Sequence, residues 1–162
     1  MAGLCGTGAF TPETLTAYLH DHIPLTAAMG LMAAEVNWDA VRLRVPITPN
    51  LNHNRTAFGG SLSSALVMAG WSFVHNRLRT SGYYAQRPGT QLVVSRSETR
   101  YLKPVVEDFD VVCGDADPAA WDHFTECLRR KHRAKFRLKA VALADGQTAA
   151  TLTAAFVAIS DA

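Results

Sequence analysis

Alternation of apolar and polar residues along the chain predicts most of its strands. In 40–47, apolar residues alternate with arginine or proline, which is typical of a half-buried strand. The apolar run 27–38 precedes it, and a turn between them predicts a hairpin. The remaining strand candidates are 91–102, 109–113, 134–143 and 148–159. Asp145-Gly146 separates the last two, and this dipeptide is a strong hairpin signal.

Three segments carry helix signals instead. Thr11 suits a helix cap and Pro12 the first helical position, so we expect a helix that begins there and ends before Pro24. The segment 61–79 is apolar on nearly every side, which indicates a buried helix. A shorter helix is expected over 117–131, where basic residues at the end suit the helix dipole.

The order of these elements predicts an α+β fold, with one curled antiparallel sheet of about six strands around one long central helix. The sheet alone leaves one side of an all-apolar helix uncovered. A second copy of the chain would cover that side, so we expect a homodimer. Residues 1–10 are small and Gly-rich and are expected to form a flexible N-terminal tail, followed by a single domain over 11–162.

Length and composition narrow the class of protein. A chain of 162 residues fits one domain, and 48% hydrophobic with 19% charged residues is an ordinary globular balance. No apolar run approaches the about 18 residues that span a bilayer, and the start lacks the pattern of a secretory signal. The three cysteines are widely spaced, which predicts reduced thiols, no metal site and a cytoplasmic protein. A net charge of +2 does not indicate nucleic-acid binding.

The polar segment 49–61 is the strongest candidate for chemistry. It brings amides, an imidazole and an arginine directly before Gly59 and Gly60, which open the predicted central helix. The backbone N–H groups of Gly60 and Ser61 would then face outward at the positive end of the helix, where they could hold a developing oxyanion. Small residues there would let a flat acyl group approach the backbone. The simpler interpretation is a plain helix cap after a polar loop.

The sequence NLNHNRTAFGGSLSSALVMAGW (50–71) resembles the helix-start motif of hotdog-fold thioesterases, most closely the thioesterase family of the YiiD C-terminal type. TRYLKPV (99–105) is similar to a strand end common in hotdog proteins, and the resemblance in element order extends over about 11–160. It implies dimers or dimers of dimers. It also implies acyl thioester substrates carried by CoA or an acyl carrier protein, with no cofactor beyond the CoA or phosphopantetheine of the substrate.

The same resemblance assigns roles to individual positions. Asn52 stands where related enzymes use an amide to position the thioester or the water. Phe58 stands where some relatives have a histidine. Val67 stands seven residues after the second glycine, where many hotdog thioesterases carry a carboxylate as base or nucleophile. The resemblance therefore implies thioester chemistry without its usual activating group.

The expected catalytic residues are Asn52, His53, Gly60, Ser61 and Ser64. Ser64 lies one helical turn after Gly60 and could hydrogen-bond the attacking water. His53 is the imidazole of the motif and an alternative base near neutral pH.

The expected substrate-binding residues come from the motif, the central helix and the strand at 91–102. They are Asn54, Thr56, Phe58, Gly59, Met68, Ser95, Ser97, Thr99, Arg100 and Lys103. Strand alternation predicts that the hydroxyls of 95, 97 and 99 share one face and line a pocket, while Glu98 lies on the other. The run 129–137 has six Lys or Arg in nine residues, and it could meet CoA phosphates or an acidic carrier protein.

Four functions remain open at this point. The motif predicts hydrolysis of an acyl thioester. Val67 favours a hotdog protein that binds an acyl thioester without hydrolysing it, or an interaction module that has lost its chemistry. A dehydratase-like enzyme needs a general acid/base pair, and the motif offers His53 without a neighbouring carboxylate. Neither nucleic acid nor membrane is an expected partner.

Overall fold

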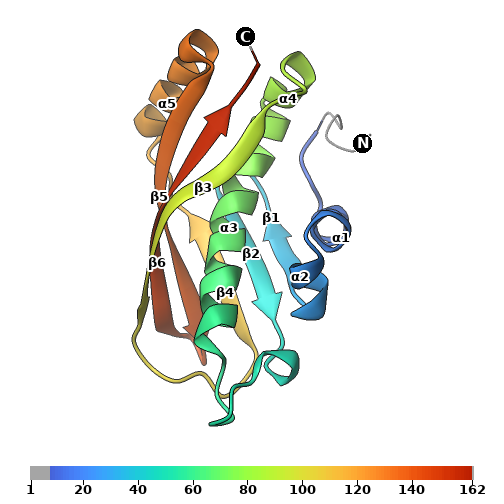
Figure 1. Cartoon of the computed structure of the whole chain (residues 1–162), viewed down its shortest axis with the longest axis vertical. Helices are drawn as coiled ribbons and strands as arrows, with labels where there is room; N and C mark the ends of the chain where they lie inside the picture. The colour runs from blue at the N-terminus through green and yellow to red at the C-terminus, as the bar shows by residue number, and fades with distance from the viewer. Residues whose placement is uncertain (1–7, 162) are drawn as a thin grey trace.

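The computed structural model describes residues 8–161, and its architecture confirms the predicted α+β hotdog fold (Figure 1). Six antiparallel strands form one sheet in the order β1-β2-β4-β5-β6-β3. The strands are β1 (Met32–Val36), β2 (Ala40–Val45), β3 (Gln91–Tyr101), β4 (Phe109–Gly114), β5 (Arg133–Ala144) and β6 (Gln147–Ile159). The helices are α1 (Pro12–His22), α2 (Pro24–Ala28), α3 (Gly59–Thr80), α4 (Tyr83–Gln86) and α5 (Pro118–Lys131), with a 3-10 turn at Thr48–Asn50.

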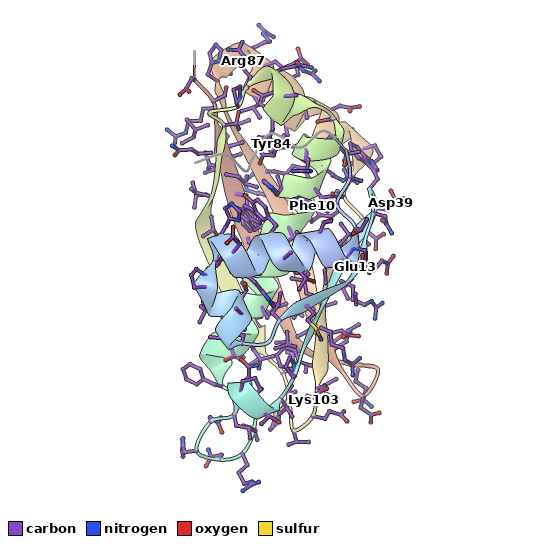
Figure 2. All side chains as sticks on the ribbon, turned by 90° about the vertical axis from the view of Figure 1, so that its right-hand side faces the viewer. Phe10, Glu13, Asp39, Tyr84, Arg87 and Lys103 are labelled. Atoms are coloured by element: carbon purple, nitrogen blue, oxygen red, sulfur yellow. The ribbon has the colours of Figure 1, made fainter. Side chains whose placement is uncertain are left out.

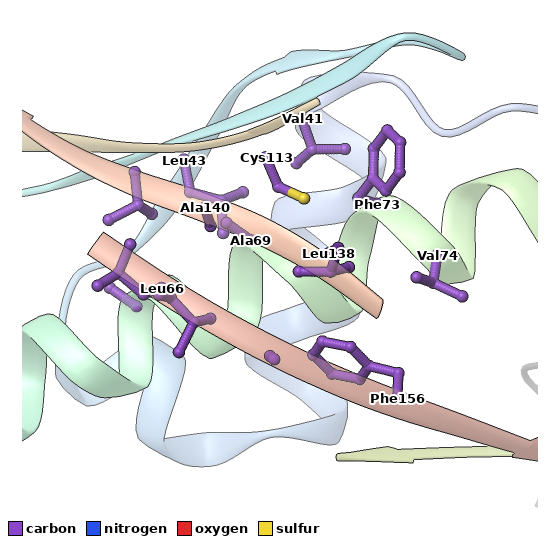
Figure 3. Packing of buried hydrophobic residues seen from close by; sticks show 14 of the residues in the cluster. Val41, Leu43, Leu66, Ala69, Phe73, Val74, Cys113, Leu138, Ala140 and Phe156 are labelled. Atoms are coloured by element: carbon purple, nitrogen blue, oxygen red, sulfur yellow. The ribbon is translucent and has the colours of Figure 1, made fainter. Parts of the chain in front are cut away.

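The sheet curls around α3, which packs against its inner face (Figure 1). Buried side chains of α3 such as Leu66 and Phe73 meet Leu138 and Phe156 of the sheet (Figure 3). Gly70 allows this close approach, because a Cβ there would lie 2.9 Å from Leu138 Cδ1. The helix is apolar all round because the sheet covers one side and α1 crosses another (Figure 2).

The N-terminal region departs from the prediction in two places. Most of the predicted tail 1–10 lies outside the described residues, but Phe10 is buried, and its N–H donates to Asn76 Oδ1 at 3.1 Å. Its ring stacks on His75, so Phe10 belongs to the core and not to a tail. Pro24 does end α1, but it also occupies the first turn of α2, so the run expected as one strand from 27 begins as a helix.

A β-bulge at Ser95 corrects the predicted faces of β3. Val94 pairs with Phe156 and Arg96 with the next residue along β6, so Ser95 is an extra residue in the strand. Side chains on the inner face are therefore Leu92 and Val94 before the bulge, then Ser97, Thr99 and Tyr101 after it. Val93 lies on the outer face. The bulge interrupts the alternation, so Ser95 does not share the inner face with Ser97 and Thr99.

Candidate active site

The motif loop before α3 is held by its own asparagines. Asn50 is buried, and its Nδ2 donates to the carbonyl oxygens of Met29 at 2.8 Å and Pro46 at 2.7 Å. Asn52 Oδ1 accepts from the N–H groups of Asn54 and Thr56 at 2.8 and 3.2 Å, and its Nδ2 donates to Thr56 Oγ1 at 2.9 Å. The carboxamide of Asn52 thus shapes the loop, and one of its two Nδ2 hydrogens remains free to meet a substrate.

The loop ends at the N-terminus of α3. No side chain of the described residues caps this helix end. The first helical bond runs from the N–H of Leu62 to the carbonyl of Phe58 at 3.1 Å. The N–H groups of Gly59, Gly60 and Ser61 therefore have no intrahelical acceptor. Three donors at the positive end of a 22-residue helix form a ready site for an oxygen that gains negative charge.

Phe58 lies directly over this helix start. Its backbone N–H donates to the carbonyl of Asn50 at 2.7 Å, while its side chain is 57% exposed. A Cβ on Gly60 would overlap the Phe58 ring, so the ring occupies the space that only a glycine leaves open. The sequence motif contains Phe58 and Gly60, but only the structure shows that the Phe58 ring fits because residue 60 has no side chain.

A hollow of about 360 Å³ opens beside the helix start. It is lined by Thr56, Ala57, Gly59, Leu62 and the segment 101–105. The Tyr101 hydroxyl donates to the Gly59 carbonyl at 2.9 Å, so the end of β3 is fixed against the first turn of α3. The alternation of the strand puts Tyr101 on the same face as Thr99, but the sequence does not reveal this contact.

Two of the three predicted hydroxyls, those of Ser97 and Thr99, share the inner face of β3, and Thr99 contacts α3. Thr99 Oγ1 lies 3.4 Å from Ser63 Oγ, and Ser97 follows on the same face. Ser95 is the bulge residue, and its hydroxyl donates to the Ala155 carbonyl at 3.1 Å. Ser63 was not predicted; its position one residue before Ser64 is the signal that could have identified it.

A half-buried stripe runs along α3 from the site towards α1. It contains Ser64, Val67, Met68 and Trp71, all on the side of the helix that the sheet leaves partly open. Trp71 closes its upper end, because Nε1 donates to the Leu92 carbonyl at 3.0 Å and the ring stacks on His75 at 4.3 Å. Val67 lies within the stripe, about one helical turn after Ser64.

Other predicted residues form no hydrogen bond or ion pair with the helix start in the described chain. His53 and Asn54 are exposed in the turn of the loop. Arg100 is on the outer face of β3, 3.5 Å from Glu98, which lies on the face opposite to Thr99 as predicted. Lys103 Nζ donates to Gln147 Oε1 at 2.9 Å and to the Ala144 carbonyl at 3.3 Å, so it ties the 101–105 segment to the β5–β6 hairpin.

Perturbed titratable groups are found away from the helix start. Burial lowers the pKa of His75 to about 3, so this imidazole is neutral, and its Nδ1 hydrogen-bonds the Tyr84 hydroxyl at 2.8 Å. Burial also raises the pKa of Cys113 to about 12, which makes it an unreactive thiol. Within residues 8–161, no group of His, Cys, Asp and Glu is arranged to hold a metal ion. In the same part of the chain, no helix has the length and apolarity of a membrane span.

A curled six-stranded antiparallel sheet around one central helix defines the hotdog fold. The chain belongs to the family described as "Putative thioesterase (yiiD_Cterm)", which matches residues 12–160. The resemblance in the motif is therefore confirmed.

Solved structures agree in fold. A Chlorobaculum tepidum protein of unknown function is 25% identical, covers 94% of this chain and 99% of its own, and has a TM-score of 0.85. A "putative thioesterase" from Shewanella oneidensis is 22% identical, with coverages of 91% and 96% and a TM-score of 0.73. A Haemophilus influenzae thioesterase of class EC 3.1.2.- is 10% identical, with coverages of 96% and 95% and a TM-score of 0.71. The family supports thioester hydrolysis as the general activity, and the solved structures agree in fold.

Proposed function

We propose that this protein hydrolyses an acyl thioester of CoA or of an acyl carrier protein to the free acid and the thiol. The observation that carries the proposal is the uncapped start of α3, where the N–H groups of Gly60 and Ser61 are free to hold the thioester oxygen. Water adds to the carbonyl carbon, its proton passes to a base, and the thiolate leaves and takes up a proton. Preorganised backbone donors stabilise the oxyanion of that addition step.

The remaining roles follow from position. The free Nδ2 hydrogen of Asn52 orients the carbonyl or the water, and Ser64, one turn into α3, hydrogen-bonds the attacking water. His53 is the alternative base, although its exposed place in the loop turn sets it apart from Ser64. Val67 supplies no carboxylate, so hydrolysis here depends on orientation and oxyanion stabilisation of an already activated acyl group. The acyl chain follows the stripe past Met68.

A homodimer completes this arrangement in our proposal. β3 is the last strand of the sheet, so its outer edge has no partner strand within the described chain. Val93, Val94 and Tyr101 on this strand are 46%, 43% and 54% exposed. An exposed apolar edge strand is a template for pairing with a second copy. Two such dimers could associate further, and we place the enzyme in the cytoplasm, where free thiols such as Cys127 persist.

Val67 favours one alternative, in which the protein binds an acyl thioester and does not hydrolyse it. A dehydratase-like reaction is less supported, because it needs an acid/base pair and the motif pairs His53 with no carboxylate among the described residues.

The test is thiol release from a panel of acyl-CoAs, from acetyl to long-chain and aromatic, followed with a colorimetric thiol reagent. Light scattering after size exclusion gives the oligomeric state of the same sample. Catalytic release of thiol supports hydrolysis, and the preferred acyl group measures the depth of the site. Binding of an acyl-CoA without any release would support the non-hydrolytic alternative.

A further inference from the structure

The outer face of the sheet has two halves that differ in charge balance. In the β1-β2-β4 half, each arginine has acidic partners. Arg42 lies 3.3 Å from Asp110 and 3.9 Å from Glu35, and Arg44 lies 3.8 Å from Asp108. Cations in this half are therefore neutralised within the chain.

The β5-β6-β3 half is not balanced. Alternate exposed positions of β5 carry four cations, Arg133, Lys135, Arg137 and Lys139, and the outer face of β3 carries Arg96 and Arg100. Glu98 is the carboxylate in these two rows, and it pairs with Arg100. The other five cations form no ion pair with any carboxylate of the described chain. Since the net charge of the whole protein is only +2, this half of the sheet stands out as a concentrated positive surface.

The two rows of cations flank a trough whose floor is β6. Arg137 and Arg96 both lie opposite Ala155, from either side of it, and they line a hollow of about 260 Å³ with Thr153 and Glu98. Rows two strands apart are separated by about 10 Å, and neighbouring cations of one row by about 7 Å. The bulge at Ser95 creates this surface, because it turns Arg96 and Arg100 from the inner face to the outer face of β3.

We propose that this trough binds an acidic α-helix of a partner protein, and that the partner is the carrier protein that holds the acyl substrate. The second clause rests on the proposed function. A helix is about 10–12 Å wide with its side chains, which matches the separation of the rows. Carboxylates at i and i+4 of a helix are about 6 Å apart, close to the cation spacing along β5. Rows of opposite charge then steer and align the partner.

The shape of the surface favours a helix over other polyanions. A membrane presents a plane, whereas the cations here stand on both sides of a floor of small residues such as Thr153 and Ala155. Single-stranded nucleic acid uses aromatic side chains for stacking, and the described outer positions of these three strands carry none.

The lower end of the trough lies next to the candidate active site. Arg100 points to the outer face, while Tyr101, the next residue, points inward and its hydroxyl contacts the Gly59 carbonyl. One residue step of β3 therefore connects the charged surface with the start of α3. A carrier aligned along the trough would have its end at the substrate entrance.

The test measures binding of fluorescently labelled holo-acyl carrier protein by anisotropy, at several salt concentrations. In the trough variant, Arg96→Glu and Arg137→Glu reverse two exposed cations that the proposal needs. The control variant, Arg42→Glu with Arg44→Glu, makes the same charge change on β2, in the half of the sheet where the chain's own carboxylates neutralise the arginines. We expect the trough variant to weaken binding about 10-fold or more and the control about 3-fold or less, and we expect wild-type affinity to fall with salt. Unfolding curves of both variants are measured to check that each one folds.

Two outcomes would overturn the proposal: equal weakening in both variants, or no carrier binding by the wild type. Tighter binding to phosphatidylglycerol vesicles or to an oligonucleotide than to the carrier would overturn it as well. Because the holo-carrier has no acyl group, binding is measured without turnover. Failure to hydrolyse both acyl-CoA and acyl-carrier protein would contradict the proposed function and leave helix binding at the trough intact. Hydrolysis of acyl-CoA without binding of the carrier would overturn this inference and leave the proposed function intact.

Discussion

Gly60→Ala should lower thioester turnover without lowering stability. The added Cβ would overlap the Phe58 ring, so the ring must move from its place at the N-cap position. We expect the displaced ring, together with the new methyl group, to obstruct the approach of a carbonyl oxygen to the N–H groups of Gly60 and Ser61. Gly60 has an ordinary helical backbone and lies in the first turn of α3, so the backbone itself accepts alanine.

Gly60→Ala is expected to lower kcat strongly while the unfolding free energy stays the same or rises slightly. Gly60→Ala keeps the backbone N–H, so the upper limit of the effect is the complete loss of one preorganised oxyanion donor, which typically reduces kcat by about 100- to 1000-fold, or about 3–4 kcal/mol of transition-state stabilisation. Gly→Ala at a compatible helical position stabilises by about 0.4–1 kcal/mol, because it restricts the unfolded chain. Displacing the Phe58 ring costs little, since that side chain is already 57% exposed. The net change in unfolding free energy should therefore be near zero or slightly favourable.

The assay compares thiol release and urea unfolding for wild type, Gly60→Ala, Phe58→Ala and the double variant. If the methyl group itself blocks the oxyanion site, the double variant stays inactive; if displacement of the ring is the cause, Phe58→Ala alone is also impaired. Thr80→Ala, an exposed substitution at the far end of α3, controls for general effects on the helix. Full activity of Gly60→Ala would refute the assignment of the oxyanion site to this helix start.

Three further predictions concern single residues. Asn52→Ala should reduce kcat about 10- to 100-fold, because it removes the loop's internal hydrogen bonds and the free Nδ2 hydrogen; unchanged turnover would exclude Asn52 from the mechanism. Arg77→Met should lower the unfolding free energy by about 2–3 kcal/mol in urea titrations, because the guanidinium lies 4.6 Å from the rings of Trp38 and Phe73 and donates to the Trp38 carbonyl at 2.8 Å. The folded pKa of His75, about 3, lies below its ordinary 6.5, so the unfolded chain binds the extra proton between these values and stability falls as pH falls through that window. His75→Phe should flatten the dependence between pH 6.5 and 5, and an unchanged slope would contradict the buried neutral imidazole.

The secondary structure was predictable because local patterns determine it. Alternation in β2 and β5 reflects contacts that repeat every two residues, and the apolar helix at 61–79 reflects contacts that repeat about every 3.6 residues. The cap at Thr11 is a local contact with Thr14. The structure confirms these elements to within a few residues. The fold class followed from their order, and the motif at 50–71 identified the family.

Features that depend on distant contacts were not predictable. The bulge at Ser95 changes the faces of β3, and a count with period two cannot detect one inserted residue. Phe10 was assigned to a tail because its partner, Asn76, lies 66 residues away. At the site, the sequence identified Gly60 as a backbone opening, while the ring of Phe58 over it and the contact of Tyr101 with Gly59 arise only from folding.

The placement of the thioester carbonyl at the start of α3 is the claim on which the account depends. It can be tested by amide NMR of the ¹⁵N-labelled protein during titration with a ketone analogue of acyl-CoA, in which a methylene group replaces the thioester sulfur. The analogue keeps the carbonyl and resists hydrolysis. We predict that the N–H resonances of Gly60 and Ser61 shift most on binding, downfield as expected for new hydrogen bonds. Saturable binding that leaves both resonances unchanged would contradict the account.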